Sequence, residues 1–401
     1  MNIIKKEGNL VKIFIKILKR FRKIILNISK SKNYKINNEI LKSQKKTVLL
    51  LSHSSIKGGA TVLLNNIAKQ IKLYDIQVVI ITQDYEEMIN LFLKESDNLY
   101  VCSTKGSFEN IIKKLAKYNI IGCLSNSVMS GNFTSILKEH NIYTVSLIHE
   151  MSNAIISLNA EKYAQNIVMY SDKIIFPSEY VAKSFKELVP FEFDYLIKPQ
   201  GLYYSFDIND TKETLKSDIS KKYNISFKNN VILNVGTSNF RKGFDIFCDM
   251  ASLDENNTYI WIGYQNNRFT RSVNKRMNNL FLINYLDSEK ELKKFYAIAD
   301  VFALTSREEP FGTVVIESFD AGVPVVAFNG CGGYMDIVKN NQTGILVNKI
   351  DSKEMLKNIK EYLNIADKST MSNNCRIVAG TMNFKLYVDY LLLQFNNEIE
   401  D

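Results

Sequence analysis

Short apolar runs alternate with longer amphipathic segments along most of the chain, from residue 46 onward. Apolar runs that are bounded by turn residues predict strands buried on both faces. Strands that alternate with helical segments favour a parallel sheet covered by helices on both sides, so the predicted fold class is α/β. The strands are predicted in two rounds, at 47–52, 77–82, 98–103, 120–125, 143–149 and 173–177, then at 231–236, 258–263, 280–284, 301–304, 325–328 and 344–347. The longest helix of the first round is predicted at 152–171.

A polar, loop-rich stretch separates the two rounds, and we place a hinge at residues 200–209. A chain of 401 residues is long enough for two hydrophobic cores, at about 100–200 residues per domain. We therefore predict one Rossmann-like domain at 46–205 and a second at 206–380. Ligands of open α/β sheets bind beyond the carboxyl ends of the strands, so the loops at those ends are the candidate functional segments.

Residues 1–45 differ from the rest of the chain in charge. Residues 1–46 hold 14 Lys or Arg and two Glu, a net charge of +12, whereas the whole chain carries +9. Within 10–30, apolar side chains fall on one helical face and basic ones on the opposite face, interrupted only by Arg22. Such a helix suits the plane of an anionic membrane surface. The alternatives are a helix packed on the protein body or a partly disordered arm; nucleic acid is disfavoured because no binding module is recognisable.

The cysteines and the apolar segments indicate in which compartment the protein is found. The five cysteines are scattered and form no C-x-x-C pair, which indicates free thiols in a reducing cytoplasm. No run approaches the roughly 20 apolar residues of a membrane-spanning helix, and the basic N-terminus lacks the apolar core of a secretory signal. We predict a cytoplasmic protein that is peripheral on the inner face of the cell membrane, with its oligomeric state open.

The most informative segment runs from Ser306 to Ala327. Two carboxylates, Glu309 and Glu317, stand eight positions apart, with Pro-Phe-Gly directly after the first. A helix is predicted to begin near Gly312, so the first carboxylate lies in the loop at a strand's carboxyl end and the second about a turn and a half into the helix. The N–H groups at a helix start attract anions. An anion cradle flanked by two carboxylates suits a sugar nucleotide.

This segment resembles the Glu-x7-Glu signature of the family-4 retaining glycosyltransferases, which have the two-domain GT-B fold. The Ala-Gly-Val-Pro exit at 321–324 and the glycine pair 332–333 make the resemblance more specific than the spacing alone. It implies that Glu309 approaches the donor sugar and that Glu317 binds the ribose hydroxyls of the nucleotide. It also implies donor contacts beside the first carboxylate, at Phe311, Gly312 and Thr313. The alternative is a helix with one exposed glutamate at each end of its first half.

A basic pair, Arg241 and Lys242, follows the first strand of the second domain and precedes a helix. Cations at a helix N-terminus oppose the helix dipole, so local stability does not explain them, whereas a diphosphate does. In the resembled family, positive residues here neutralise the leaving nucleotide diphosphate, and Gly236 borders it. Many members carry Arg directly after this glycine, where the chain has Thr237, so we assign the phosphate role to the basic pair. The alternative is unrelated surface charge.

The first domain offers its own loop candidates. Gly58 and Gly59 follow the first strand and look like the family's Gly-Gly-Ala loop, which borders the donor phosphates; a tight structural turn explains them equally well. His149 ends a predicted strand where the family often places a His near the sugar and acceptor. Retaining members are described as reacting on the face from which the leaving group departs, so we expect this His to position the sugar or phosphate and not to act as a general base. Glu150 either orients His149 or faces the acceptor.

Further candidates lie at other strand ends. In the resemblance, the loops at Gly263 and Leu286 flank the nucleotide base, while the aromatic residues nearby, Trp261 and Tyr285, are interpreted mainly as core. Three polar residues are interpreted as either acceptor contacts or helix caps: Asn126, Ser127 and Ser178.

The sequence therefore predicts a retaining glycosyltransferase that moves a hexose from a nucleotide diphosphate sugar to a surface-glycan or lipid-linked acceptor. The two carboxylates and the two cations are expected to converge on the donor in a cleft between the domains. No Asp-x-Asp motif or His/Cys cluster indicates a bound metal or other cofactor. The resemblance covers residues 46–365 and implies that the C-terminal helix, at 381–401, returns to the first domain. The alternatives are a sugar-nucleotide epimerase on a similar scaffold and a non-catalytic sugar-nucleotide-binding subunit of a glycosylation complex.

Overall fold

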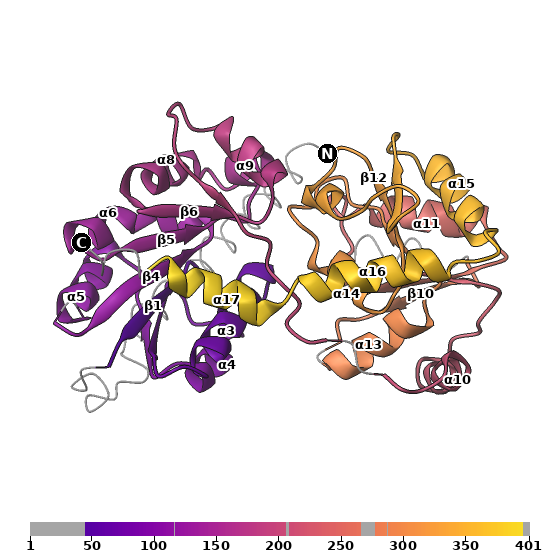
Figure 1. The fold of residues 1–401 in the computed structure, drawn as a ribbon, viewed down its shortest axis with the longest axis horizontal. Coiled ribbons are helices and arrows are strands. Elements are labelled where there is room, and N and C mark those ends of the chain that lie inside the picture. Colours follow the sequence, from indigo (N-terminus) through magenta and orange to yellow (C-terminus); the bar gives the residue numbers. More distant parts are fainter. Residues whose placement is uncertain (1–44, 116, 206–207, 266–276, 287, 396–401) are drawn as a thin grey trace, which may run out of the picture. The chain divides into compact units, whose positions relative to one another are not determined.

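The computed structural model describes residues 45–395, apart from 116, 206–207, 266–276 and 287. The described chain divides into two compact units, each an α/β structure with its own sheet (Figure 1). The first unit holds the described residues up to Phe176, the segment Ser184–Leu196 and the chain from Val388. The second unit holds Pro177–Lys183 and Ile197–Tyr387.

The amphipathic helix expected at 10–30 lies outside the described residues, so its membrane role stays a prediction. Within the described part of the chain, the helices are all too short or too polar to cross a membrane.

The first unit is built on a seven-stranded sheet with the order β3-β2-β1-β4-β5-β6-β7. β1 pairs in parallel with β2 on one side and with β4 on the other. The ladders that join β2 to β3, β4 to β5 and β5 to β6 are also parallel. The strands are β1 (Thr47–Ser52), β2 (Gln77–Thr82), β3 (Asn98–Val101), β4 (Ile120–Asn126), β5 (Thr144–Leu147), β6 (Lys173–Phe176) and β7 (Leu196–Ile197).

Helices cover both faces of this sheet. The chain advances in one direction along the sheet from β1 to β3 and in the other from β4 to β6, so right-handed crossovers place the two sets of helices on opposite faces. Figure 1 shows α3 and α4 on one side and α5, α6 and α8 on the other. The helices are α3 (Gly59–Ile71), α4 (Ile89–Glu95), α5 (Lys105–Leu115), η1 (Val128–Asn132), α6 (Thr134–Glu139), α7 (Ser152–Ser157) and α8 (Glu161–Tyr170). α9 (Glu179–Lys186) follows β6, and its residues up to Lys183 belong to the second unit.

The second unit is built on a six-stranded sheet with the order β10-β9-β8-β11-β12-β13. Its five ladders are parallel, including the central one between β8 and β11. The strands are β8 (Val231–Val235), β9 (Thr258–Ile262), β10 (Leu280–Ile283), β11 (Val301–Leu304), β12 (Val325–Phe328) and β13 (Gly344–Val347).

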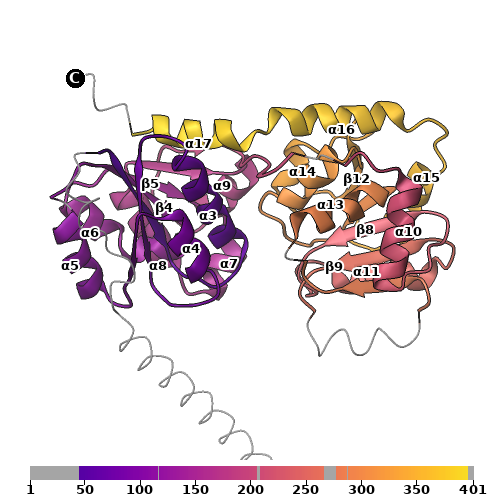
Figure 2. The same ribbon diagram turned by 90° about the horizontal axis from the view of Figure 1, so that it is seen from below.

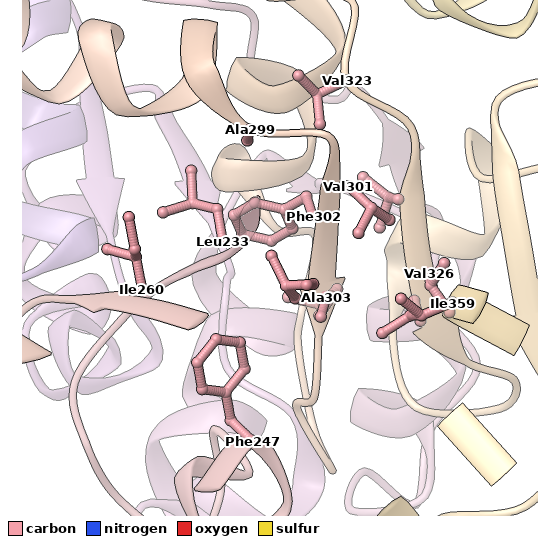
Figure 3. Packing of buried hydrophobic residues seen from close by; sticks show 14 of the residues in the cluster. Leu233, Phe247, Ile260, Ala299, Val301, Phe302, Ala303, Val323, Val326 and Ile359 are labelled. Carbon is pink, nitrogen blue, oxygen red and sulfur yellow. The ribbon is translucent and has the colours of Figure 1, made fainter. Parts of the chain in front are cut away.

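The helices of the second unit pack on both faces of this sheet and enclose a continuous apolar core. Figure 1 shows α11 and α15 on one side, with α13 and α14 on the other, and α16 lies alongside α14 in both views (Figures 1 and 2). Central core residues such as Leu233, Phe247 and Phe302 are fully buried (Figure 3). The helices are α10 (Lys212–Tyr223), α11 (Phe244–Leu253), α13 (Glu289–Ile298), α14 (Thr313–Asp320), η2 (Gly333–Asp336), α15 (Ser352–Leu363), α16 (Ser369–Thr381) and α17 (Phe384–Leu393).

All twelve predicted strands are confirmed, and their ends differ from the prediction by at most two residues. The two-residue strand β7 was missed because it is too short to produce an apolar run. The single helix predicted at 152–171 is wrong: the structure has α7 and α8 instead. Asn159 between them adopts a left-handed conformation with φ of 51°, which ends the first helix.

The C-terminal helix α17 begins in the second unit and ends in the first, which includes the chain from Val388. Within that unit, the Phe395 ring occupies the space beside Gly122, where an added Cβ would lie 2.3 Å from ring carbons. Asp389 accepts a hydrogen bond from the Tyr74 hydroxyl. These contacts attach the end of the chain to the first sheet and to the end of α3.

Candidate active site

The order of the second sheet marks one place where a ligand site is expected. β8 and β11 are neighbours, and the chain leaves β8 toward β9 but leaves β11 in the opposite direction, toward β12. The loops that follow these two strands therefore separate at a topological switch point, which is where open α/β sheets bind ligands. The β8 loop covers residues 236–243, and the β11 loop covers 305–312.

The two loops are held against each other by a glycine at the start of α11. Gly243 has φ of +68°, and a Cβ there would lie 1.9 Å from the carbonyl oxygen of Thr305, so a larger residue cannot fit. The Thr305 hydroxyl donates to the carbonyl of Lys242 at 2.9 Å. The Lys242 N–H donates to Asn239 Oδ1 at 2.9 Å. The backbone of the lysine is thus fixed beside the end of β11.

This packing brings Lys242 and Glu309 together. The ammonium group of Lys242 donates to Glu309 Oε2 in an ion pair, and the Ser306 hydroxyl donates to the same oxygen at 3.2 Å. Glu309 is only 7% exposed. Burial alone would raise the pKa of its carboxyl, but Lys242, then Arg241, and the hydrogen bonds outweigh burial and hold the pKa below its usual value. The carboxylate is therefore ionised at neutral pH.

The backbone of Glu309 is fixed by the glycine-rich loop after β12. Its N–H donates to the Cys331 carbonyl at 2.8 Å, and its own carbonyl accepts from the Gly333 N–H at 3.2 Å. A Cβ on Gly332 would lie 2.0 Å from the Glu309 carbonyl oxygen, and one on Gly333 would lie 2.3 Å from that of Pro310. The glycine pair is therefore required for the close approach that positions the carboxylate.

Arg241 joins the same group from the β8 loop. Its guanidinium donates from Nη1 to the Glu308 carbonyl at 2.8 Å and remains solvent-exposed. The structure thus brings three of the four predicted charged residues together: Arg241, Lys242 and Glu309.

Glu317 interacts elsewhere in the same unit. It accepts a hydrogen bond from the Tyr296 hydroxyl at 2.8 Å, and burial raises the pKa of its carboxyl despite that bond. Leu202, Tyr203 and Tyr204 line one side of the pocket that it faces, together with residues of α13 and α14, which are Glu289, Leu292, Lys293, Tyr296 and Asp320. The sequence did not indicate this tyrosine-rich setting, because its parts lie far apart along the chain.

The other residues predicted to contact the donor lie in different environments, and some of them are buried in the core. Gly236 and Gly263 touch through their backbones, since a Cβ on Gly263 would lie 2.2 Å from the Gly236 carbonyl oxygen. Thr313 accepts a hydrogen bond from Gln200 at 2.7 Å. Phe311 is 3% exposed and belongs to the core, so its side chain is not available to a ligand. Leu286 packs at the edge of the same core.

The aromatic residues at the ends of β9 and β10 separate into two types. Trp261 is fully buried and donates from its indole to the Gly236 carbonyl at 2.8 Å, which confirms its structural role. Tyr285 is 40% exposed and stacks on Tyr264, with ring centroids 5.0 Å apart and the planes tilted by 16°. The interpretation of Tyr285 as a core residue is therefore wrong.

The first unit has a second switch point, between β1 and β4. Gly58 caps the start of α3, and neither it nor Gly59 has any atom within 4 Å of an added Cβ. On the neighbouring strand, Asn126 donates to the Ala60 carbonyl at 2.8 Å and contacts His149 Nε2 through Oδ1 at 3.2 Å. One asparagine therefore links His149 to Ala60, the residue that follows the glycine pair.

Glu150 is engaged by the loop that follows β4. Its carboxylate accepts from the Ser127 hydroxyl, from the Val128 N–H at 3.1 Å and from the His149 N–H at 3.2 Å. Of the two roles left open, these contacts favour orienting the His149 backbone. The cap interpretation also fits Ser127, which caps η1, and Ser178, which accepts from the Val181 N–H at 3.3 Å.

Two histidines of this unit have pKa values below the usual one. For His149 and for His53, burial lowers the pKa, and the charge of Glu150 opposes the shift only in part. His53 follows β1, and its buried Nδ1 has no hydrogen-bond partner among the described residues. His53 was not among the predicted site residues, although its place directly after a strand was a signal. Neutral imidazoles can accept a hydrogen bond from a substrate hydroxyl.

Part of the second unit is similar to a known family. Residues 216–376 match the model of the family described as glycosyl transferases group 1. The Escherichia coli lipopolysaccharide glucosyltransferase WaaG is 26% identical over 41% of this chain and 45% of its own length. A probable sucrose-phosphate synthase of Thermosipho melanesiensis is 28% identical over 42% of this chain and 40% of its own length. The chain thus spans less than half the length of these curated relatives.

Solved structures show the fold over a larger part of the chain. Anabaena HepE, in complex with UDP and glucose, matches with a TM-score of 0.74 and 17% identity, covering 88% of this chain and 99% of that one. The WaaG structure matches with a TM-score of 0.63 and 16% identity, covering 86% of this chain and 98% of that one. Both matches extend over the two α/β units and so agree with the GT-B fold expected from the sequence. The chain has the GT-B fold, and residues 216–376 of its second unit are similar to the glycosyl transferases group 1 family.

Proposed function

We propose that this protein is a retaining glycosyltransferase that moves a hexose from a nucleotide diphosphate sugar to a surface-glycan or lipid-linked acceptor. The observation that carries the proposal is the pairing of Lys242 with Glu309 at the switch point of the second sheet. A cation for a diphosphate and a carboxylate for sugar hydroxyls stand side by side where this class of sheet binds ligands.

The basic side of the site suits the leaving group. A lysine ammonium has three N–H donors, so Lys242 can bind Glu309 and a diphosphate oxygen at the same time. Arg241 adds an exposed guanidinium from the adjacent position. Negative charge grows on the diphosphate as the bond to the sugar breaks, and fixed positive groups stabilise that charge most in the transition state. The main contribution of these residues is thus positive charge that stabilises the leaving diphosphate, not removal of a proton.

Glu309 provides the sugar contact. Its pKa lies below the usual value, so at neutral pH it accepts hydrogen bonds from hydroxyl groups and donates none. Its backbone is locked by the loop at 331–333, which restricts where the carboxylate can point. A fixed acceptor of this kind orients the donor hexose toward the bond that breaks.

Glu317 is assigned to the ribose of the nucleotide. Tyr296 occupies one lone pair of Oε2, and the carboxylate retains further acceptor positions for a pair of neighbouring hydroxyls. The tyrosines around it, Tyr203 and Tyr204, supply apolar ring surface for the nucleoside. This assignment follows the family resemblance and is independent of the Lys242–Glu309 pair.

Retention is proposed to proceed on one face of the sugar. The acceptor oxygen bonds to the anomeric carbon on the face from which the diphosphate departs, and the departing phosphate oxygen takes the acceptor's proton. In this scheme His149 positions the sugar or phosphate from the first unit, with Gly58 and Gly59 beside the phosphates. Residues of the chain supply charge and orientation, and metal independence is part of the proposal.

Relatives guide the choice of donor and acceptor. Structural matches include HepE in complex with UDP-glucose, and matched sequences include an Escherichia coli O-antigen biosynthesis glycosyltransferase, WclY. UDP-hexoses are therefore the first donors to test, and lipid-linked or surface glycans the first acceptors.

The proposal is tested by a thermal-shift screen of nucleotides and nucleotide sugars, followed by turnover with the best ligand. A ligand at about 100 times its Kd raises the free energy of unfolding by about 2.7 kcal/mol. Glu309→Ala should abolish transfer and leave nucleotide binding measurable, whereas Glu361→Gln, at an exposed position on α15, should be active. An active Glu309→Ala enzyme would refute the central assignment. Product NMR should show the donor's anomeric configuration, and excess EDTA should leave the rate unchanged; inversion or loss of activity would contradict those parts.

The basic arm is proposed to hold the enzyme on an anionic membrane. Deleting residues 1–45 should reduce co-sedimentation with vesicles of anionic phospholipid, and added salt should reduce binding of the full chain in the same way. Neutral phosphatidylcholine vesicles serve as the control. Equal binding of the truncated and full-length proteins would refute the anchoring role.

A further inference from the structure

A second set of charged contacts joins the same two loops on either side of Lys242. Arg307, two positions before Glu309, directs its guanidinium into the β8 loop. Nη1 and Nη2 donate to the two carboxylate oxygens of Asp245, at 2.8 and 2.6 Å. Nη1 also donates to the Phe240 carbonyl at 2.7 Å, and the guanidinium carbon lies 3.7 Å from the centre of the Phe240 ring.

The backbone completes the connection in both directions. The Arg307 N–H donates to the Arg241 carbonyl at 2.8 Å. In return, the Arg241 guanidinium donates to the Glu308 carbonyl, also at 2.8 Å. Each loop thus contributes one arginine side chain that donates a hydrogen bond to a backbone carbonyl of the other loop. Because Phe240 and Asp245 lie on either side of Lys242, Arg307 holds the turn that carries the lysine from both ends.

Local stability gives a weak reason for this arrangement. Asp245 lies in the first turn of α11, where a carboxylate is already favoured by the helix dipole. A partly exposed ion pair contributes about 0–1 kcal/mol to stability. The geometry is more specific than such a pair requires. One guanidinium makes a two-pronged hydrogen bond to a carboxylate, lies over a ring face and donates to a carbonyl.

We propose that Arg307 is a positioning residue that sets the geometry of Lys242 relative to Glu309, and through it the rate of glycosyl transfer. It acts through the β8 loop and does not touch the donor. Lysine cannot replace it, because an ammonium group offers neither two parallel donors nor a stacking plane. The inference rests on the proposed function, since it assigns the transfer step to the Lys242–Glu309 pair.

The test compares Arg307→Lys and Asp245→Asn with Arg376→Lys. Arg376, on α16, is the control because its guanidinium also bonds a side chain and a carbonyl, Ser372 at 2.9 Å and Ala321 at 3.2 Å, and both partners lie outside the β8 and β11 loops. Misplacement by about 1 Å can cost on the order of 10²-fold in rate. Arg307→Lys is expected to lower kcat by about 10- to 100-fold with less than about a threefold change in the Kd for the donor nucleotide. Asp245→Asn should lower kcat in the same direction, and Arg376→Lys should leave it unchanged.

A double-mutant cycle distinguishes positioning from general loosening of the fold. If Arg307 acts through Lys242, Arg307→Lys should have no further effect on kcat in a Lys242→Met background. Full additivity of the two losses, or an unchanged kcat in Arg307→Lys, would overturn the proposal.

A readout without turnover separates this inference from the proposed function. Carboxyl-carbon NMR of labelled glutamate follows the titration of Glu309, whose pKa Lys242 holds down. Arg307→Lys should raise that pKa, and Arg376→Lys should not. If the wild-type chain transfers no sugar, the proposed function fails while this titration still tests the positioning role; an unchanged Glu309 titration in Arg307→Lys overturns it.

Discussion

The two switch points of this molecule use glycine and charge in different ways. At the second-unit site, Gly243, Gly332 and Gly333 are required by backbone atoms that approach within 2.3 Å of an added Cβ. At the first-unit site, Gly58 and Gly59 have open space at the same position. The fold alone thus explains the glycines of the second unit but leaves those of the first unit without a packing reason.

The two sites also differ in the charged groups that they hold. The second-unit site holds an ammonium, a carboxylate and a guanidinium in contact, whereas the first-unit site holds histidines whose pKa values burial lowers. The second-unit site therefore presents exposed positive charge, whereas the first-unit site combines neutral imidazoles with one carboxylate, Glu150, that is already hydrogen-bonded within its own loop. On the proposed function, the second unit is expected to supply most of the charge stabilisation and the first unit mainly orientation.

The largest expected effect is the loss of kcat/KM, which should be greater for a substitution in the second-unit site than for one in the first-unit site. Lys242→Met should lower kcat/KM by about 10²- to 10³-fold, because a preorganised charge at a developing anion contributes about 3–4 kcal/mol to transition-state stability. His149→Gln should lower it by about tenfold, since it removes one positioning contact. Steady-state kinetics with a single donor provide both values. A greater loss in His149→Gln would reverse the proposed division of labour.

The next largest effect is on the free energy of unfolding, which should fall more when a glycine of the second-unit site is replaced than when one of the first-unit site is. Gly243→Ala should reduce the free energy of unfolding by about 3 kcal/mol, because the left-handed backbone and the contact with Thr305 both disfavour a Cβ. Gly58→Ala should change it by less than about 0.5 kcal/mol. Urea unfolding of each variant measures the difference, and a strongly destabilised Gly58→Ala protein would show that packing does constrain the first-unit loop.

The smallest effect is a pH dependence confined to the first unit. A histidine whose pKa is lower in the folded state favours folding above its unfolded value of 6.5 and loses that contribution as the pH falls below it. Hydrogen exchange should therefore show weaker protection of β1, β4 and β5 at pH 5.5 than at pH 7.5. The strands of the second unit should change less over this range, because all three histidines of the chain lie in the first unit. Replacing both His53 and His149 by Asn should remove the difference; its persistence would contradict the assignment.

The strands could be predicted because each is an apolar run bounded by turn residues, as in Val301–Leu304. The sequence also placed Lys242 and Glu309 in loops at strand ends, but it did not reveal their contact. That contact depends on β8 and β11 being neighbours, and strand order is set by long-range packing. The same limit explains why the Arg307–Asp245 pair was missed and why Tyr296 was not recognised as the partner of Glu317.

Gly122 and Phe395 have a consequence for how the protein is made. The ring that covers Gly122 on β4 belongs to Phe395, which follows the entire second unit in sequence, so the first sheet lacks this cover until residue 395 has left the ribosome. Domains usually fold one after another during synthesis, N-terminal first. Here one contact of the first sheet is made by a segment that is synthesised after the second unit, so a nascent chain stalled before residue 384 should leave the surface beside Gly122 open to chaperones.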